Sequence, residues 1–225
     1  GSPAPPAPPL PGLLLDSVSI TPSQPRPGQA VTLSVRAQGA SEKTRVVAHW
    51  RSRHGASSAT LAPQGTGSVL TFTGEVPGLP DQTLVQLSFE AEDPTAGEAK
   101  LVVDGSRSAL QYFVLGEIPT KLRFYCLELE PERVPVLLKD PERDRFKGHF
   151  IAVRDGRAEI HNGVTLQIRG GTWTRRWLKR GMVISFSARS PFEGYRQINL
   201  RGQWHDESNI REQLGYDLFN ELGVA

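Results

Sequence analysis

Short runs of alternating apolar and polar residues, separated by turn residues, fill the chain from residue 13 to about residue 116. At positions 31–37 the apolar side chains recur at every second residue, which is the pattern of a strand with one buried face. Turn-forming Gly, Pro and Asp residues interrupt the runs at 22–28, 65–67, 77–81 and 94–97. The predicted strands are 15–21, 30–37, 45–51, 69–75, 84–93 and 111–114, with a seventh at 98–103. This pattern predicts an immunoglobulin-like or fibronectin-like β-sandwich for residues 13–116, with Trp50 in its core.

Length and composition indicate two ordinary globular domains. The chain has 225 residues, of which 38% are hydrophobic, and no apolar run is long enough to span a bilayer. The formal net charge of +2 gives no whole-chain argument for binding nucleic acid or a membrane. Cys126 is the single cysteine, so the sequence offers neither an internal disulfide nor a cysteine-based metal site.

Residues 1–12 are rich in Pro and Ala, which favours an extended linker without a function of its own. The segment has no positively charged start and no apolar stretch, so we expect no signal peptide within this sequence.

The pattern of the second half, residues 117–225, predicts an antiparallel β-meander followed by a helix. Strands are predicted at 121–129, 148–154, 157–160, 164–169 and 182–188, with charged turns at 131–133 and 140–144. The pairs Asp-Gly at 155–156 and Asn-Gly at 162–163 predict hairpin turns. Asp206 is a good N-cap for a helix that ends near Leu222, with Gly223 as its C′ residue. The chain as a whole is therefore predicted to be a β-rich α+β protein.

Several motifs occur in a fixed order within this half. They are Val164-Thr-Leu-Gln-Ile-Arg-Gly170, then Thr172, Arg175 and Lys179, Phe192-Glu-Gly194, Ile198-Asn-Leu200, Asp206-Glu-Ser208-Asn-Ile-Arg211-Glu212 and Leu222-Gly-Val224. Their order and spacing resemble the spore-coat protein H (CotH) family of secreted, kinase-like proteins, over about residues 120–225. Sandwich domains also precede such domains in that family.

The resemblance implies the N-terminal lobe of an atypical protein kinase that uses ATP with Mg²⁺ and phosphorylates exported proteins. By this resemblance, three residues of this sequence match family positions that bind the cofactor. Lys179 ends the Arg-Gly hairpin, where the family has a basic residue suited to nucleotide phosphates, and Arg169 begins the turn. Glu212 lies in the first helix after the hairpin, where a kinase pairs a glutamate with its phosphate-binding lysine.

The same resemblance places the family's acidic metal ligands and catalytic base after the Leu-Gly-Val motif, and the sequence ends at Ala225. We therefore expect an inactive, truncated fragment of a kinase, without catalytic residues or metal ligands, from a parent protein exported to the cell surface, the periplasm or the outside. The usual Lys-Lys pair is here Lys179-Arg180, and arginine does not replace lysine freely at a phosphate site. The alternative is a non-catalytic extracellular or coat-associated protein that only binds or has a structural role.

The basic loop at 170–181 has several interpretations. It carries four cations and two tryptophans, Trp173 and Trp177. A solvated surface turn, a loop that contacts nucleotide phosphates, and a site for single-stranded nucleic acid or anionic polysaccharide all fit this composition. The low net charge argues against nucleic acid. The substrate and the oligomeric state do not follow from the sequence.

Overall fold

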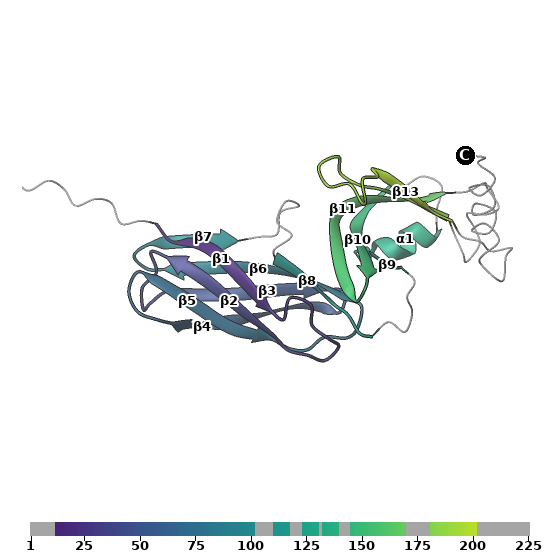
Figure 1. Ribbon diagram of the computed structural model, residues 1–225. Coiled ribbons are helices and arrows are strands. Elements are labelled where there is room, and N and C mark those ends of the chain that lie inside the picture. Colours follow the sequence, from purple (N-terminus) through teal and green to yellow (C-terminus); the bar gives the residue numbers. More distant parts are fainter. Residues whose placement is uncertain are drawn as a thin grey trace, which may run out of the picture. The chain divides into compact units, whose positions relative to one another are not determined.

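The computed structural model describes residues 12–101, 110–117, 123–130, 132–139, 145–169 and 181–201. This part of the chain is mostly β, with an eight-stranded sheet, a five-stranded sheet and one short helix (Figure 1). The β-rich character predicted from the sequence is confirmed. The predicted C-terminal helix near 206–222 lies outside the described residues.

The first sheet is a curled, half-barrel-like antiparallel sheet. Its order is β1-β2-β5-β4-β3-β6-β7, and β8 pairs with β6. The curl passes through β4, because residues 55–61 of this strand pair with β3 whereas residues 62–64 pair with β5. The bounds are β1 Leu14–Thr21, β2 Val31–Gln38, β3 Arg45–Ser52, β4 Gly55–Gln64, β5 Val69–Val76, β6 Thr83–Asp93, β7 Gly97–Leu101 and β8 Gln111–Val114.

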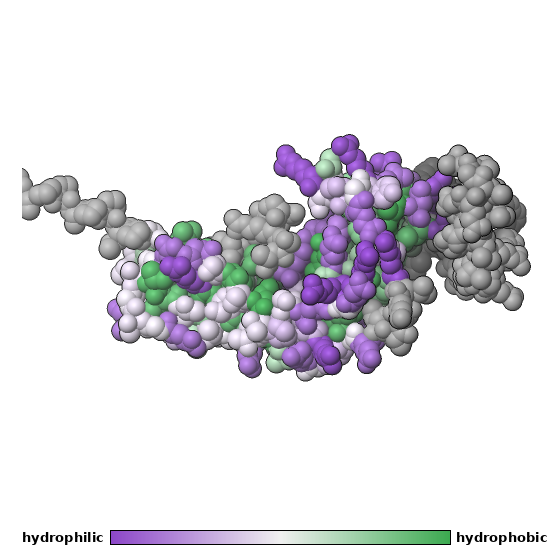
Figure 2. All heavy atoms as spheres, viewed as in Figure 1, coloured by the Kyte–Doolittle hydropathy of each residue, from purple (hydrophilic) through white to green (hydrophobic). Residues whose placement is uncertain are grey.

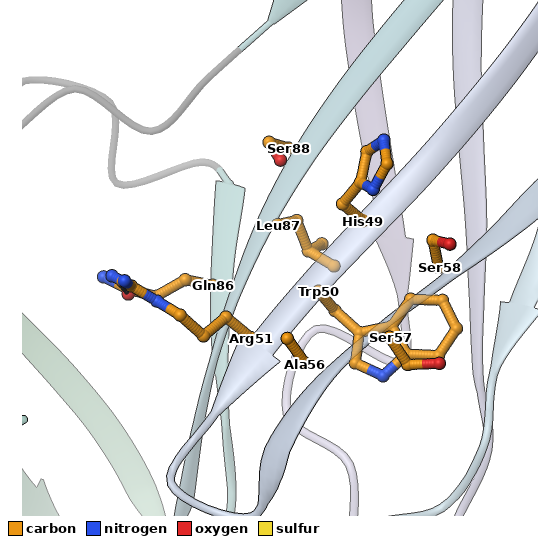
Figure 3. A pocket seen from close by; sticks show the side chains of 9 residues that line it. All are labelled: His49, Trp50, Arg51, Ala56, Ser57, Ser58, Gln86, Leu87 and Ser88. Carbon is orange, nitrogen blue, oxygen red and sulfur yellow. Dashed lines mark hydrogen bonds between the residues drawn. The ribbon is translucent and has the colours of Figure 1, made fainter. Parts of the chain in front are cut away.

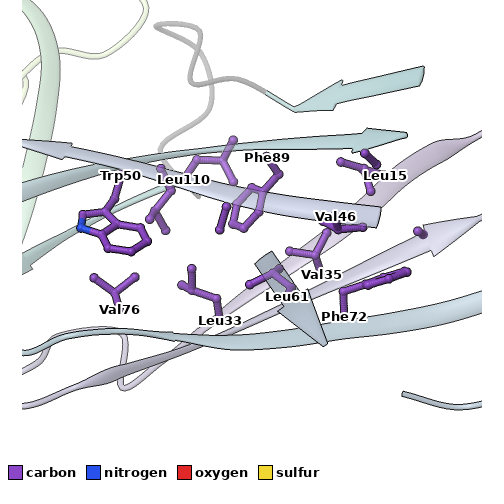
Figure 4. Packing of buried hydrophobic residues seen from close by; sticks show 14 of the residues in the cluster. Leu15, Leu33, Val35, Val46, Trp50, Leu61, Phe72, Val76, Phe89 and Leu110 are labelled. Atoms are coloured by element: carbon purple, nitrogen blue, oxygen red, sulfur yellow. The ribbon is translucent and has the colours of Figure 1, made fainter. Parts of the chain in front are cut away.

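The core of this sheet follows the predicted alternation. In β2 the apolar residues Val31, Leu33 and Val35 are buried, and polar residues alternate with them. They belong to one core cluster with the wholly buried Phe72 and Phe89. Figure 4 shows Leu33 and Val35 among these side chains. Each large apolar side chain buried in this way contributes roughly 1.5–3 kcal/mol. Trp50 belongs to the same core, as the sequence predicts.

The second sheet has the order β13-β12-β11-β10-β9 and confirms the predicted meander. Asp155 and Gly156 have φ values of 50° and 72°, and they form the predicted hairpin turn between β10 and β11. The bounds are β9 Phe124–Glu128, α1 Arg133–Lys139, β10 Phe146–Arg154, β11 Arg157–Arg169, β12 Gly181–Ser185 and β13 Gln197–Leu200.

The hairpin turn predicted at Asn162-Gly163 is wrong, because both residues lie inside β11. His161 and Val164 are both buried although three positions separate them, so the alternation of faces shifts at this point. Gly163 has a φ of 61°, a backbone conformation that glycine adopts at little cost. The Asn-Gly pair therefore makes an irregularity within one long strand.

The helix α1 lies between the charged turns predicted at 131–133 and 140–144, and only Arg133 belongs to both the first turn and the helix. Pro135 is in its first turn, where proline is tolerated because the missing N–H would have no helical partner there. Leu137 is buried and anchors the helix. None of the helices in the described ranges has the length and apolar character needed to cross a membrane.

The chain divides into two compact units, Gly1–Cys126 with Ile151–Ile160, and Leu127–Phe150 with His161–Ala225. Within the first unit, Ile151 and Val153 form a small cluster with Leu84, Phe113 and Leu115. The proposed linker at 1–12 and the predicted boundary near residue 117 stay predictions.

Candidate functional site

A polar groove lies on one face of the five-stranded sheet. It contains Arg169, which is the one residue of the three predicted cofactor-binding residues that the structure describes. The alternation of β11 places Thr165, Gln167 and Arg169 on this face. Cross-strand pairing sets Ser185 of β12 beside Thr165 and Gln197 of β13 beside Ser185. These residues, with Arg145, Ile168 and Val183, line a hollow of about 460 Å³. Hydrophilic residues predominate on the visible surface around these strands (Figure 2).

The described lining of the groove is cationic and rich in hydrogen-bond donors. Arg145 and Arg169 are both exposed, and no carboxylate is among the lining residues that the structure describes. Lys147 Nζ lies 2.8 Å from Thr165 Oγ1 and donates a hydrogen bond to it, which brings a third cation to this face. Guanidinium groups bind phosphate and carboxylate oxygens through paired N–H donors, so the groove suits an anion.

The opposite face of the sheet is a packed apolar layer that holds the strands in place. Leu166 and Ile184 are buried there. The Phe150 ring is wholly buried, with ring centroids 5.3 Å from Phe186 and 5.1 Å from Phe192 in edge-on arrangements. Such pairs contribute roughly 0.5–1.5 kcal/mol beyond the burial of apolar area. The groove is therefore built on a rigid support.

Buried His161 belongs to this aromatic cluster. Its ring lies 5.4 Å from Phe186 and 5.3 Å from Phe192 between centroids. On the other face of the sheet, His149 Nδ1 and Asn162 Oδ1 lie 2.7 Å apart and form a hydrogen bond across β10 and β11. These contacts hold β10 and β11 together on both faces of the sheet, just before the irregularity at Gly163.

Arg169 is the last residue of β11 and pairs with Gly181. The loop that follows it, with Lys179, and the segment with Glu212 lie outside the described residues, so their proximity to Arg169 stays a prediction. Sequence reasoning did not identify Arg145, Gln197 or Ser185. The alternation of β11 pointed to Thr165 and Gln167, but Arg145 joins them only through the order of the strands.

The chemistry of the groove suits an anion better than a metal ion. Its guanidinium, amide and hydroxyl groups can donate hydrogen bonds to the oxygens of an anion, whereas Mg²⁺ prefers carboxylate oxygens. In the part of the chain that the structure describes, no group of three or more His, Cys, Asp or Glu residues is arranged to hold a metal ion.

Comparison with solved structures gives distant likenesses. A cycloalternan-forming enzyme from Listeria monocytogenes, solved with a pentasaccharide substrate, is 10% identical, with a TM-score of 0.36, over 78% of this chain and 14% of that chain. The sporulation control protein Spo0M from Bacillus subtilis is 11% identical, with a TM-score of 0.28, over 93% of this chain and 98% of that one. The chain thus spans about 14% of the length of the first structure. These scores are too low to transfer a fold or a function.

Comparison with sequences gives one family. No curated protein matches the chain. Residues 166–225 match the family model described as CotH kinase protein. The match begins within β11, next to the groove, and continues through the positions of Lys179 and Glu212. The C-terminal part of the chain, residues 166–225, is thus similar to the CotH kinase protein family, which confirms the resemblance for that part.

Proposed function

We propose that residues 117–225 form part of a CotH-like, kinase-type domain, and that the groove beside Arg169 holds the phosphates of ATP. The observation that carries this proposal is the family match over 166–225, together with the cationic groove where the match begins. The protein would then be part of an exported atypical kinase whose substrates are exported proteins.

The described residues would contribute binding and orientation. Arg145 and Arg169 would pair with phosphate oxygens through their planar guanidinium groups. Thr165 and Ser185 supply hydroxyl groups, and Gln197 supplies amide N–H donors, for the remaining oxygens. ATP, when bound, supplies the phosphoryl group for transfer.

Lys179 and Glu212 complete the proposal. A lysine paired with a glutamate holds the cation in position on the phosphates, which is the arrangement that kinases use. In the CotH-like reading Lys179 contacts the phosphates and Glu212 orients it. The described lining of the groove offers no carboxylate for Mg²⁺, so we assign no role to a groove residue in metal binding.

The curled first sheet would serve as an immunoglobulin-like module ahead of the kinase-like part. Its strands are antiparallel and have five to eleven residues each, apart from the shorter β8, and they share an apolar core. These features are typical of such modules. The strand β4 pairs first with β3 and then with β5 without a break. This agrees with an immunoglobulin-like module, because strands that change from one sheet to the other occur in β-sandwiches with bent corners.

A thermal-shift titration with ATP, with and without Mg²⁺, tests the proposal. The chain is compared with Lys179→Ala, with Arg169→Gln, and with Lys43→Ala as a control, because Lys43 is exposed in the turn between β2 and β3. We expect ATP to raise the melting temperature of the chain and of the control, and to have a smaller effect on Lys179→Ala and Arg169→Gln. An equal shift in all four proteins contradicts the assignment of the site to Arg169 and Lys179. No shift in any of them contradicts nucleotide binding and favours the non-catalytic alternative.

A further inference from the structure

A second hollow lies on the first sheet, over the middle of β3 and its neighbours β4 and β6. In the cross-strand register, His49 stands between Ser58 and Ser88. Two residues further along β3, Arg51 stands between Ala56 and Gln86. These side chains come from three adjacent strands, as Figure 3 shows.

The hollow arises from differences in side-chain size. Ala56, Ser58 and Ser88 are small, whereas His49 and Arg51 rise between them, so space remains beside the two larger side chains. The volume of this space is about 540 Å³. Sites for small molecules have volumes of roughly 300–1,000 Å³, so the hollow is large enough for one or two sugar rings.

The chemistry of the hollow combines one fixed cation with several hydroxyl and amide groups. Arg51 Nη2 donates a 2.9 Å hydrogen bond to Gln86 Oε1, which positions the guanidinium (Figure 3). Arginine has five N–H donors, so others stay available to a ligand. His49 Nε2 lies 3.5 Å from Glu90 Oε2, and this contact orients the imidazole beside the two serines.

The lining favours an anionic ligand that also carries hydroxyl groups. The described residues that line the hollow include no carboxylate, and the neighbouring Glu90 carboxylate lies beside His49. Serine hydroxyls both donate and accept hydrogen bonds, which matches the hydroxyl groups of a saccharide.

We propose that this hollow binds an acidic saccharide, with its carboxylate on Arg51 and its hydroxyl groups on Ser58, Ser88 and His49. This binding is separate from the proposed nucleotide site. It gives the first sheet a role in attaching the protein to an acidic glycan.

The test is isothermal titration of the full chain with tetragalacturonate. Arg51→Gln removes the cation, and Ser58→Leu fills the hollow. Arg45→Gln is the matched control, because Arg45 is an exposed arginine of the same strand and face but does not line the hollow. We expect Arg51→Gln and Ser58→Leu each to weaken binding by about tenfold or more, and Arg45→Gln to leave it unchanged.

Two comparison ligands separate a saccharide site from general attraction of charge. Maltotetraose has the same length without the charge, and a tetraglutamate peptide has the charge without the sugar. The proposal is supported if tetragalacturonate binds with much higher affinity than both maltotetraose and the tetraglutamate peptide. No binding of tetragalacturonate, equal binding of the peptide or of maltotetraose, or equal losses in Arg45→Gln and Arg51→Gln would overturn it, provided that the melting temperatures of the variants match that of the parent chain.

Discussion

Gly148 lies where β10 passes very close to the end of β9, and its replacement by alanine should destabilise the sheet that carries the groove. A Cβ atom at this position would lie 2.6 Å from the backbone oxygen of Glu128, 2.8 Å from Leu129 Cδ2 and 3.2 Å from Leu166 Cδ1. The first of these atoms is backbone and cannot rotate away, so the two strands must separate locally.

The cost can be worked out from these contacts. Forcing a methyl group into a packed position costs roughly 1–3 kcal/mol, and a weakened hydrogen bond between the strands adds about 1 kcal/mol. The lower entropy of the unfolded alanine chain offsets roughly 0.4–1 kcal/mol. We therefore expect Gly148→Ala to lower the free energy of unfolding by about 2 kcal/mol, which corresponds to a melting temperature lower by about 4–8 °C.

Differential scanning calorimetry, with Gly12→Ala as the control, measures this effect. No atom lies within 4 Å of a Cβ built on Gly12, so this variant undergoes the same change of residue without the clash. If Gly148→Ala melts at the same temperature as Gly12→Ala, the close approach of β9 and β10 is refuted.

Three further predictions concern stability. Gly78→Ala should lower the free energy of unfolding by about 2–4 kcal/mol in urea titration, because its Cβ would lie 2.1 Å from the Gly28 carbonyl oxygen, and an unchanged midpoint would contradict this. Phe150→Leu should cost about 1–2 kcal/mol through lost ring contacts, measured by the same titration, and a loss confined to a few tenths would show that the rings contribute little. Hydrogen bonds from Ser41, Thr44 and Thr95 hold the pKa of the buried Asp93 carboxyl well below its usual range. The stability that these hydrogen bonds contribute is present above the ordinary carboxyl pKa of about 3.9 and is lost as the pH falls below it. The free energy of unfolding should therefore decrease less between about pH 6 and about pH 3 in Asp93→Asn than in the parent chain. An equal decrease in both proteins would argue against this role.

The strands could be predicted where one face is buried, and not where both faces are exposed. The alternation in β2 and β6 follows directly from their buried residues. In β4 only Leu61 is buried, so its sequence has no apolar period and the strand was not predicted. The strand forms because β3 supplies hydrogen-bonding partners to residues 55–61 and β5 supplies them to residues 62–64.

Local turn signals were reliable only where the surrounding packing agreed with them. Asp155-Gly156 forms its hairpin, whereas Asn162-Gly163 does not. His161 enters the aromatic cluster on one side of that pair and Val164 is buried on the other, so packing keeps the chain in one strand. The helix α1 escaped prediction because it is short and contains a proline.

The groove could be predicted only along a single strand. The face shared by Thr165, Gln167 and Arg169 follows from alternation in β11. Arg145 and Gln197 reach the same groove through the order of the strands, which the spacing of residues in the sequence does not specify.

The central claim is that the groove beside Arg169 binds the phosphates of ATP, and equilibrium competition with a fluorescent ATP analogue tests it most directly. The double variant Arg145→Gln/Arg169→Gln is compared with Arg154→Gln/Arg157→Gln, which removes the same charge from two exposed arginines outside the groove. Loss of two charge-assisted contacts predicts at least about tenfold weaker binding in the first variant and unchanged binding in the second. Equal affinity in both variants and the parent chain would contradict the claim.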